Sequence, residues 1–246
     1  MKILQSFVLT LVLFVPEVEY AFEAGKVALQ KPYRVYIAAH VPFTTRVTTV
    51  QKNLAKKITE RLGARSFVVE HSPHITLLAY GDASKDELRG IKAAFNQVWR
   101  EYKDAKTTKK LSRFYFKQGA QRLGFGTHAK YIGMDLEGEH TDVLKQLAIN
   151  LDKTIRARPE VLAARPELAR TPLIVKRLLR PHMTLGHLNT KVITNMDAAF
   201  DQIQDILDDT MPPAHACAGK TFSLPTMTLY SSTHGHINNP EVTHAL

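Results

Sequence analysis

Apolar positions in this chain follow two periods, which separate the expected strands from the expected helices. Alternation of apolar and polar residues predicts strands at residues 33–39, 74–80, 111–118, 121–125, 130–136, 173–188 and 221–231. Recurrence every three or four residues predicts helices at residues 45–62, after Ser84, at 141–155 and at 195–207. The order of strand, helix, strand, helix and strand then repeats in outline, which indicates an α+β protein of two related lobes.

Local signals mark several boundaries of these elements. Gly63 follows the first helix where a C-cap glycine is expected, and Ser84 with Glu87 forms a capping box at the start of the second. Residues 156–171 combine arginines with prolines, which predicts a basic loop with one or two helical turns. Residues 233–246 are expected to form a polar tail after the last strand.

The first residues have the pattern of an export signal. Lys2 precedes an apolar run at residues 7–15 and then small residues, so we expect residues 1–24 to be a signal peptide. An uncleaved anchor and a plain N-terminal extension are the alternatives. The run is too short to span a bilayer comfortably, so we expect no stable membrane span. An exported protein, periplasmic or secreted, is the expected outcome, with a cytoplasmic protein as the alternative.

Composition narrows the class of protein. The chain has 246 residues, of which 44% are hydrophobic, enough for one large core or two joined lobes. Residues 25–232 are therefore expected to be a single bilobal domain. The net charge of +10 favours an anionic partner such as nucleic acid. One cysteine, Cys217, excludes an internal disulfide framework and a cysteine-based metal cluster.

Two short motifs carry the candidate chemistry. Residues 73–77 read Pro-His-Ile-Thr-Leu and residues 181–185 read Pro-His-Met-Thr-Leu. Because successive side chains of a strand face opposite ways, the histidine and threonine of each motif share one face. A single His-x-Thr is expected by chance in a chain with 11 histidines, but the repeated five-residue pattern favours a site over two ordinary strand histidines.

With the strands at 34–38 and 131–137 and the closing residues 229–232, these motifs resemble the 2H phosphoesterase superfamily. Within it, the chain is most similar to the RNA 2′,3′-cyclic phosphodiesterases, also called 2′-5′ RNA ligases, and the likeness covers residues 33–232. The resemblance implies a two-lobed α+β fold, with two antiparallel sheets facing a central cleft and helices outside. It also implies metal-independent hydrolysis of 2′,3′-cyclic phosphates at RNA ends or in nucleotides, or of 2′-5′ links.

The resemblance gives the motif residues their roles. One imidazole accepts a proton from water while the other donates a proton to the departing ribose oxygen. We expect His74 to be the acid and His182 the base, with the roles exchanged in the reverse ligation. Thr76 and Thr184 are expected to hydrogen-bond the non-bridging phosphate oxygens.

Other residues near the motifs are secondary candidates. Arg180 precedes the second motif and is expected either to bind phosphate or the RNA backbone, or to be solvated. Tyr36 and Tyr230 are expected to stack on a base or to pack in the core. His187 lies an odd number of residues from His182, so in an unbroken strand it faces the other way.

We expect no cofactor and no obligate metal. His234 and His236 can bind zinc or nickel adventitiously, but no further ligand spacing supports a site. The expected partner is an RNA end or a nucleotide with a cyclic phosphate, and the expected state is a monomer. The alternative function is a non-catalytic RNA or nucleotide-binding module that uses the same cleft. Two histidines with two threonines favour the enzyme, because binding an anion requires no base.

Overall fold

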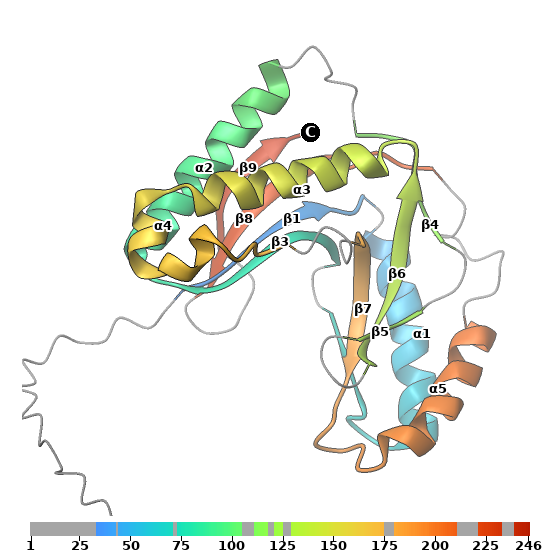
Figure 1. Cartoon of the computed structure of the whole chain (residues 1–246). Coiled ribbons are helices and arrows are strands. Elements are labelled where there is room, and N and C mark those ends of the chain that lie inside the picture. The colour runs from blue at the N-terminus through green and yellow to red at the C-terminus, as the bar shows by residue number, and fades with distance from the viewer. Residues whose placement is uncertain are drawn as a thin grey trace, which may run out of the picture. The chain divides into compact units, whose positions relative to one another are not determined.

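Nine strands of the described chain pair antiparallel, in the order β4-β6-β7-β3-β1-β8-β9, with β2 on β7 and β5 on β6 (Figure 1). The strands are β1 Tyr33–His40, β2 Phe67–Val69, β3 His74–Ala83, β4 Phe114–Phe116, β5 Gln121–Gly124, β6 Ala129–Gly138, β7 His182–Leu188, β8 Thr226–Ser232 and β9 Asn239–Ala245. This computed structural model describes residues 33–42, 44–70, 73–104, 111–117, 121–124, 129–174, 180–210, 221–232 and 239–246. The expected signal peptide at 1–24, Cys217, His234 and His236 lie outside the described residues.

The helices fall into two groups, one for each half of the sheet (Figure 1). They are α1 Thr44–Leu62, α2 Lys85–Asp104, α3 Thr141–Arg156, α4 Pro159–Ala164 and α5 Met196–Thr210, with a 3-10 turn η1 at Pro166–Ala169. Helices α1 and α5 pack together, and α1 contacts β2 and β7. Helix α2 contacts α3, α4, β1, β3 and β9. The described elements therefore confirm the α+β class.

Two helix boundaries follow from the local signals in the sequence. The Ser84 N–H donates to Glu87 Oε2 at 2.8 Å, and the Glu87 N–H donates to Ser84 Oγ at 3.2 Å, which confirms the capping box of α2. At the end of α1, Gly63 has a φ of 93° and its N–H donates to the Thr59 carbonyl at 2.9 Å. A positive φ is the conformation that glycine adopts at low cost, so the chain leaves the helix there.

The two halves of the sheet are joined through the two motifs themselves. Among the described residues, β3 and β7 pair at a single position, Ile75 with Met183. On one side lie β1, β8 and β9, and on the other lie β2, β4, β5 and β6. The two expected sheets are the two halves of this path, and the apolar residue of each motif joins them at this one pair. The central cleft stays a prediction.

The last residues of the chain are not only a polar tail. Strand β9 pairs with β8, and His244 lies between Phe95 and Trp99 of α2, with ring centroids 5.2 and 5.0 Å away. The His244 Nε2 donates to the side-chain oxygen of Asn96 at 2.9 Å. The prediction of a polar tail at 233–246 is therefore wrong for β9. Polar residues dominate this strand, so the apolar pattern gave no signal for it.

Two of the four arginines of the segment 156–171, Arg156 and Arg165, are held by acidic partners. Arg156 Nε lies 2.9 Å from Asp152 Oδ1. Arg165 Nε lies 3.0 Å from Glu87 Oε1, and its guanidinium carbon is 4.5 Å from the centroid of the Tyr80 ring. The expected helical turns are present as α4 and η1, but the segment is tied to α2 and β3 rather than forming a separate basic loop.

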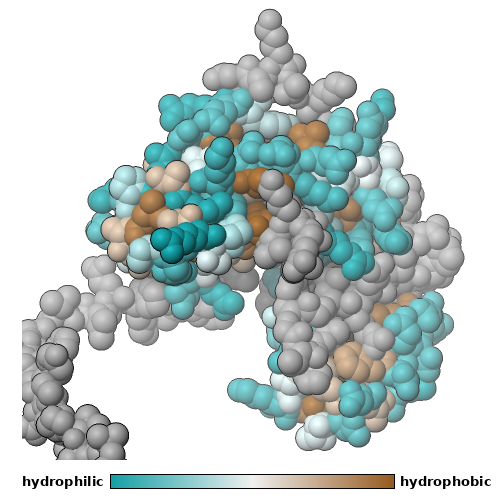
Figure 2. All heavy atoms as spheres, viewed as in Figure 1, coloured by the Kyte–Doolittle hydropathy of each residue, from teal (hydrophilic) through white to brown (hydrophobic). Residues whose placement is uncertain are grey.

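The described surface is mainly polar, as Figure 2 shows for one face. The large apolar side chains exposed among the described residues are Val68, Val143 and Val192, and each is on a different segment of the chain. In that part of the chain, no helix has both the length and the apolar character needed to cross a bilayer.

Candidate active site

The polar side chains of the two motifs lie on one face of the sheet, around the Ile75–Met183 pair. Ile75 and Met183 are fully buried, whereas the histidine and the threonine of each motif are partly exposed. Residues that flank a paired position face the side opposite to it, so all four polar side chains surround this pair. The predicted faces of both strands are therefore confirmed.

His182 is oriented by the backbone just before it. Its Nδ1 lies 2.8 Å from the carbonyl oxygen of Arg180. Because a carbonyl oxygen can only accept, Nδ1 carries the hydrogen of this bond. In the neutral ring the Nε2 atom then carries the lone pair, and the contact with the Arg180 carbonyl fixes the ring orientation.

Arg180 is paired with a carboxylate on the neighbouring strand. Its Nε lies 2.7 Å from Asp135 Oδ2, and a second guanidinium nitrogen bonds the same oxygen. Asp135 is also the partner of His182 in the β6–β7 pairing and is 5% exposed. The arginine is thus held beside His182. Sequence analysis missed Asp135, although a carboxylate inside an otherwise apolar strand was a visible signal.

Tyr36 lies beside His74 and stacks on Tyr230. The two tyrosine rings are stacked, with centroids 4.8 Å apart and planes 8° apart, and the Tyr36 ring is 5.3 Å from the His74 ring. Burial raises the pKa of Tyr36, and the neighbouring Tyr230 and Glu70 raise it further. The Tyr36 phenol therefore stays protonated at neutral pH and keeps a hydrogen to donate.

His40 completes this aromatic group and was missed by sequence analysis. It is the partner of His74 in the β1–β3 pairing, and its Nε2 shares a hydrogen bond with the Tyr230 hydroxyl. The signal was present, because Tyr36 and His40 are an even number of residues apart on one strand. Burial lowers the pKa of His40 from its ordinary value of 6.5, and the nearby His74 lowers it further.

Stability is expected to fall at acid pH in a manner that depends on His40. Since its folded pKa is below the unfolded value of 6.5, the unfolded chain binds more protons as the pH falls through that value. The contribution of neutral His40 to the free energy of unfolding is therefore present above pH 6.5 and is lost below it. Urea unfolding of wild type and His40→Gln between pH 5 and 8 should show a weaker pH dependence for the variant. Equal pH dependence would contradict this assignment.

A bulge in β7 changes the face of His187. Thr184 pairs with Gly133 and Gly186 pairs with Ile132, so Leu185 is an extra residue on β7. The alternation shifts there, and His187 faces the same side as His182, with its ring 6.0 Å from that of Tyr131. The expectation that His187 faces the other way is therefore wrong, because the strand is not unbroken.

The bulge is held from outside the strand. The buried side chain of Gln51 on α1 donates to the Leu185 carbonyl at 2.8 Å and to the Glu70 carbonyl at 2.7 Å. The Glu70 N–H also donates to the Leu185 carbonyl, at 3.0 Å. Helix α1 thereby fixes the strand that carries His182 and Thr184.

Replacing Gln51 with leucine is expected to destabilise the fold by about 1 to 2 kcal/mol, because the Leu185 and Glu70 carbonyls each lose the hydrogen bond from the buried amide. Urea unfolding measures this change. The Gln51→Glu variant, which supplies an acceptor where a donor is needed, should be at least as unstable. A Gln51→Leu variant as stable as wild type would show that the amide does not hold the bulge.

Two imidazoles and two hydroxyls share one face of the sheet. The imidazoles can transfer protons, and the hydroxyls can form hydrogen bonds. In the part of the chain that the structure describes, no group of three or more His, Cys, Asp or Glu side chains is arranged to hold a metal ion.

Comparisons with known proteins show a shared fold. No protein-family model and no curated protein matches the chain. The chain is similar to the structure of Kluyveromyces marxianus Usb1 with uridine monophosphate, at 12% identity and a TM-score of 0.53, covering 88% of this chain and 99% of that chain. It is similar to TT0787 of Thermus thermophilus, at 16% identity and a TM-score of 0.50, covering 87% and 94%. Escherichia coli LigT complexed with 3′-AMP matches at 14% identity and a TM-score of 0.45, covering 88% and 98%.

Proposed function

We propose, from the premise that this chain has the 2H phosphoesterase fold, that it is a phosphoesterase with two catalytic histidines. Its substrate is a 2′,3′-cyclic phosphate at an RNA end or in a nucleotide, or a 2′-5′ phosphodiester link. The observation that carries this proposal is the common face of the two motifs, with one histidine and one threonine on each side of the Ile75–Met183 pair.

Hydrolysis at phosphorus needs two proton transfers on opposite sides of the phosphate. The oxygen of water forms a bond to phosphorus while a bond from phosphorus to a ribose oxygen breaks. With Nδ1–H on the Arg180 carbonyl, His182 in its neutral form has a lone pair at Nε2 that takes the proton of water. Protonated His74 gives its proton to the departing ribose oxygen. Histidines from two strands supply this in-line arrangement.

The two threonines and Arg180 stabilise charge on the phosphate. The hydroxyls of Thr76 and Thr184 share the face of the histidines and donate to the non-bridging oxygens as these gain charge. Arg180 adds a positive charge next to His182, held in place by Asp135. The net charge of +10 also favours an anionic substrate.

A nucleotide ligand has support from the aromatic group and from the fold comparison. Tyr36, which is partly exposed and backed by Tyr230, lies against His74, where a base or ribose joined to the phosphate would be. Usb1, which shares the fold, was solved with uridine monophosphate.

The test is hydrolysis of the four nucleoside 2′,3′-cyclic monophosphates and of 2′-5′ oligoadenylate in excess chelator. Separation of 2′- from 3′-phosphates by chromatography identifies the departing oxygen. We expect turnover that survives the chelator. Tight nucleotide binding without turnover would instead favour a non-catalytic binding module, and neither binding nor turnover would overturn the proposal.

A further inference from the structure

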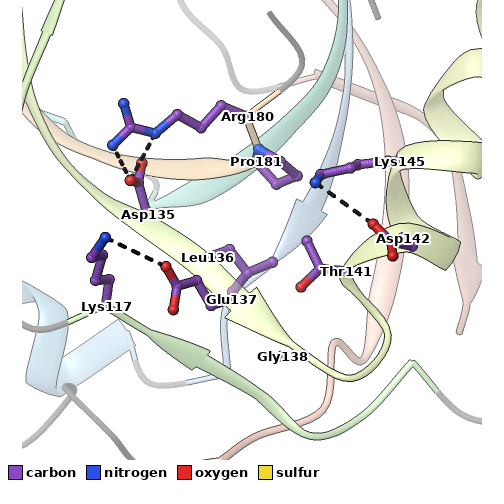
Figure 3. A pocket seen from close by; sticks show the side chains of 10 residues that line it. All are labelled: Lys117, Asp135, Leu136, Glu137, Gly138, Thr141, Asp142, Lys145, Arg180 and Pro181. Carbon is purple, nitrogen blue, oxygen red and sulfur yellow. Dashed lines mark hydrogen bonds and ion pairs between the residues drawn. The ribbon is translucent and has the colours of Figure 1, made fainter. Parts of the chain in front are cut away.

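Each motif histidine has an ionisable partner directly across its strand pair. His182 on β7 is paired with Asp135 on β6. His74 on β3 is paired with His40, the last residue of β1. The Asp135 carboxylate is bonded to the guanidinium of Arg180, as the dashed lines in Figure 3 show. The charge opposite His182 is therefore balanced by an ion pair, whereas the charge opposite His74 depends on whether His40 binds a proton.

His40 lies next to His74 on the same face of the sheet. Residues directly paired across antiparallel strands have their side chains on one face, with Cβ atoms about 5 Å apart. Two positive charges at such a distance repel each other, so protonation of one imidazole disfavours protonation of the other. Burial lowers the pKa of His40, and the nearby His74 lowers it further. The neutral form of His40 is therefore favoured at neutral pH.

Neutral His40 is joined to the aromatic group beside His74. Its Nε2 is hydrogen-bonded to the Tyr230 hydroxyl. Burial raises the pKa of Tyr230, so this hydroxyl keeps a hydrogen that it can donate to the lone pair of a neutral imidazole. The Tyr230 ring stacks on Tyr36, whose ring lies 5.3 Å from that of His74. Glu70, which follows β2, is a further ionisable group that acts on Tyr36.

We propose that His40 is a positioning residue for His74. As a neutral imidazole it holds Tyr230 stacked on Tyr36, and so keeps Tyr36 beside His74, without placing a second positive charge there. This inference rests on the proposed function, in which protonated His74 gives its proton to the departing ribose oxygen. Loss of the hydrogen bond would free the rings beside His74, and a fixed positive charge at position 40 would remove the proton of His74 at a lower pH.

A double-variant cycle tests the hydrogen bond. His40→Leu and Tyr230→Phe each remove one side of it, and Tyr230→Phe keeps the stacked ring. Each is expected to lower kcat for adenosine 2′,3′-cyclic monophosphate by about two- to tenfold, the effect of one neutral hydrogen bond. The double variant should be no slower than the slower single variant, because both changes remove the same bond. His40→Gln keeps a neutral group that can form a hydrogen bond, so it should recover most of the loss caused by His40→Leu.

The pH dependence of kcat tests the charge at position 40, which a merely structural role would leave without effect. His40→Lys places a permanent positive charge opposite His74. Because a like charge disfavours the protonated imidazole, the high-pH limb of the curve should move to lower pH by about 1 pH unit. Asn53→Lys adds the same charge on an exposed position of α1 and should leave this limb in place. His40→Gln adds no charge and should leave it in place as well.

Two results would overturn the assignment of His40, namely additive losses in the cycle or a high-pH limb that His40→Lys does not move. In both cases, loss of turnover in His74→Ala would still support the proposed function. If wild type hydrolyses no cyclic phosphate, the titration of His74 followed by NMR decides whether His40 controls its proton. A midpoint that His40→Lys lowers and Asn53→Lys does not lower supports the inference, and equal midpoints overturn it.

Discussion

Replacing either His74 or His182 with alanine is expected to lower kcat for a 2′,3′-cyclic nucleotide by about 10²- to 10⁴-fold, the usual effect of losing one acid or base. Each imidazole moves a different proton in the proposed mechanism, and neither can take over the other's position across the Ile75–Met183 pair. The measurement is kcat in excess chelator at saturating substrate. Binding of the product nucleotide should change far less than kcat.

The double variant should be little slower than the slower single variant, because the two residues act as a unit. The wild-type rate is expected to have a bell-shaped dependence on pH, since one histidine must be neutral and the other protonated. Each alanine variant should lose one limb of this curve, and the limb that is lost identifies which histidine is the acid.

The control is a third histidine outside the site. His244 is on β9, packed between rings of α2, and His244→Gln keeps a group that can donate to Asn96. Its kcat should stay within a few-fold of wild type at a temperature well below its unfolding midpoint. A His74→Ala or His182→Ala variant that retains more than a tenth of the wild-type kcat would remove that histidine from the mechanism.

The faces of the motif strands were predictable because they depend on local geometry alone. Side chains alternate in any strand, so the sequence alone puts His74 with Thr76 and His182 with Thr184. Helix ends were predictable for the same reason. The capping box at Ser84 uses atoms only three residues apart.

The features that could not be predicted depend on contacts between distant residues. The bulge at Leu185 is held by Gln51, which is 134 residues away in the chain, and it decides which way His187 faces. Asp135 has a partner in Arg180, 45 residues away. Strand β9 is held by hydrogen bonds to β8 and by the rings around His244. Because these contacts come from distant parts of the chain, the strand forms without an apolar periodicity of its own.

The Gly186→Ala substitution is expected to destabilise the protein by about 2 to 3 kcal/mol, near the upper end of the range for adding a methyl group to a well-packed core. Gly186 lies on β7 opposite Val69 of β2. A Cβ atom there would lie 2.5 Å from the Val68 carbonyl oxygen and would also overlap the Phe67 ring. A ring can rotate, but a backbone carbonyl of a paired strand can move only if β2 leaves β7.

The free energy of unfolding of Gly186→Ala, measured in urea, tests this close approach. Gly90→Ala on α2 is the matched control, because its Cβ would meet the flexible end of Glu160, Oε2, at 3.2 Å and would lie at an ordinary contact distance of 3.4 Å from the Arg158 Cβ. Alanine also stabilises a helix by about 1 kcal/mol relative to glycine, so the control should be neutral or stabilising. Because β7 also carries His182 and Thr184, the displacement of β2 by Gly186→Ala should lower kcat as well, even where the variant is fully folded. A Gly186→Ala variant with wild-type stability would mean that β2 is not packed against β7 in solution, and that Gln51 and Glu70 alone set the position of the second motif.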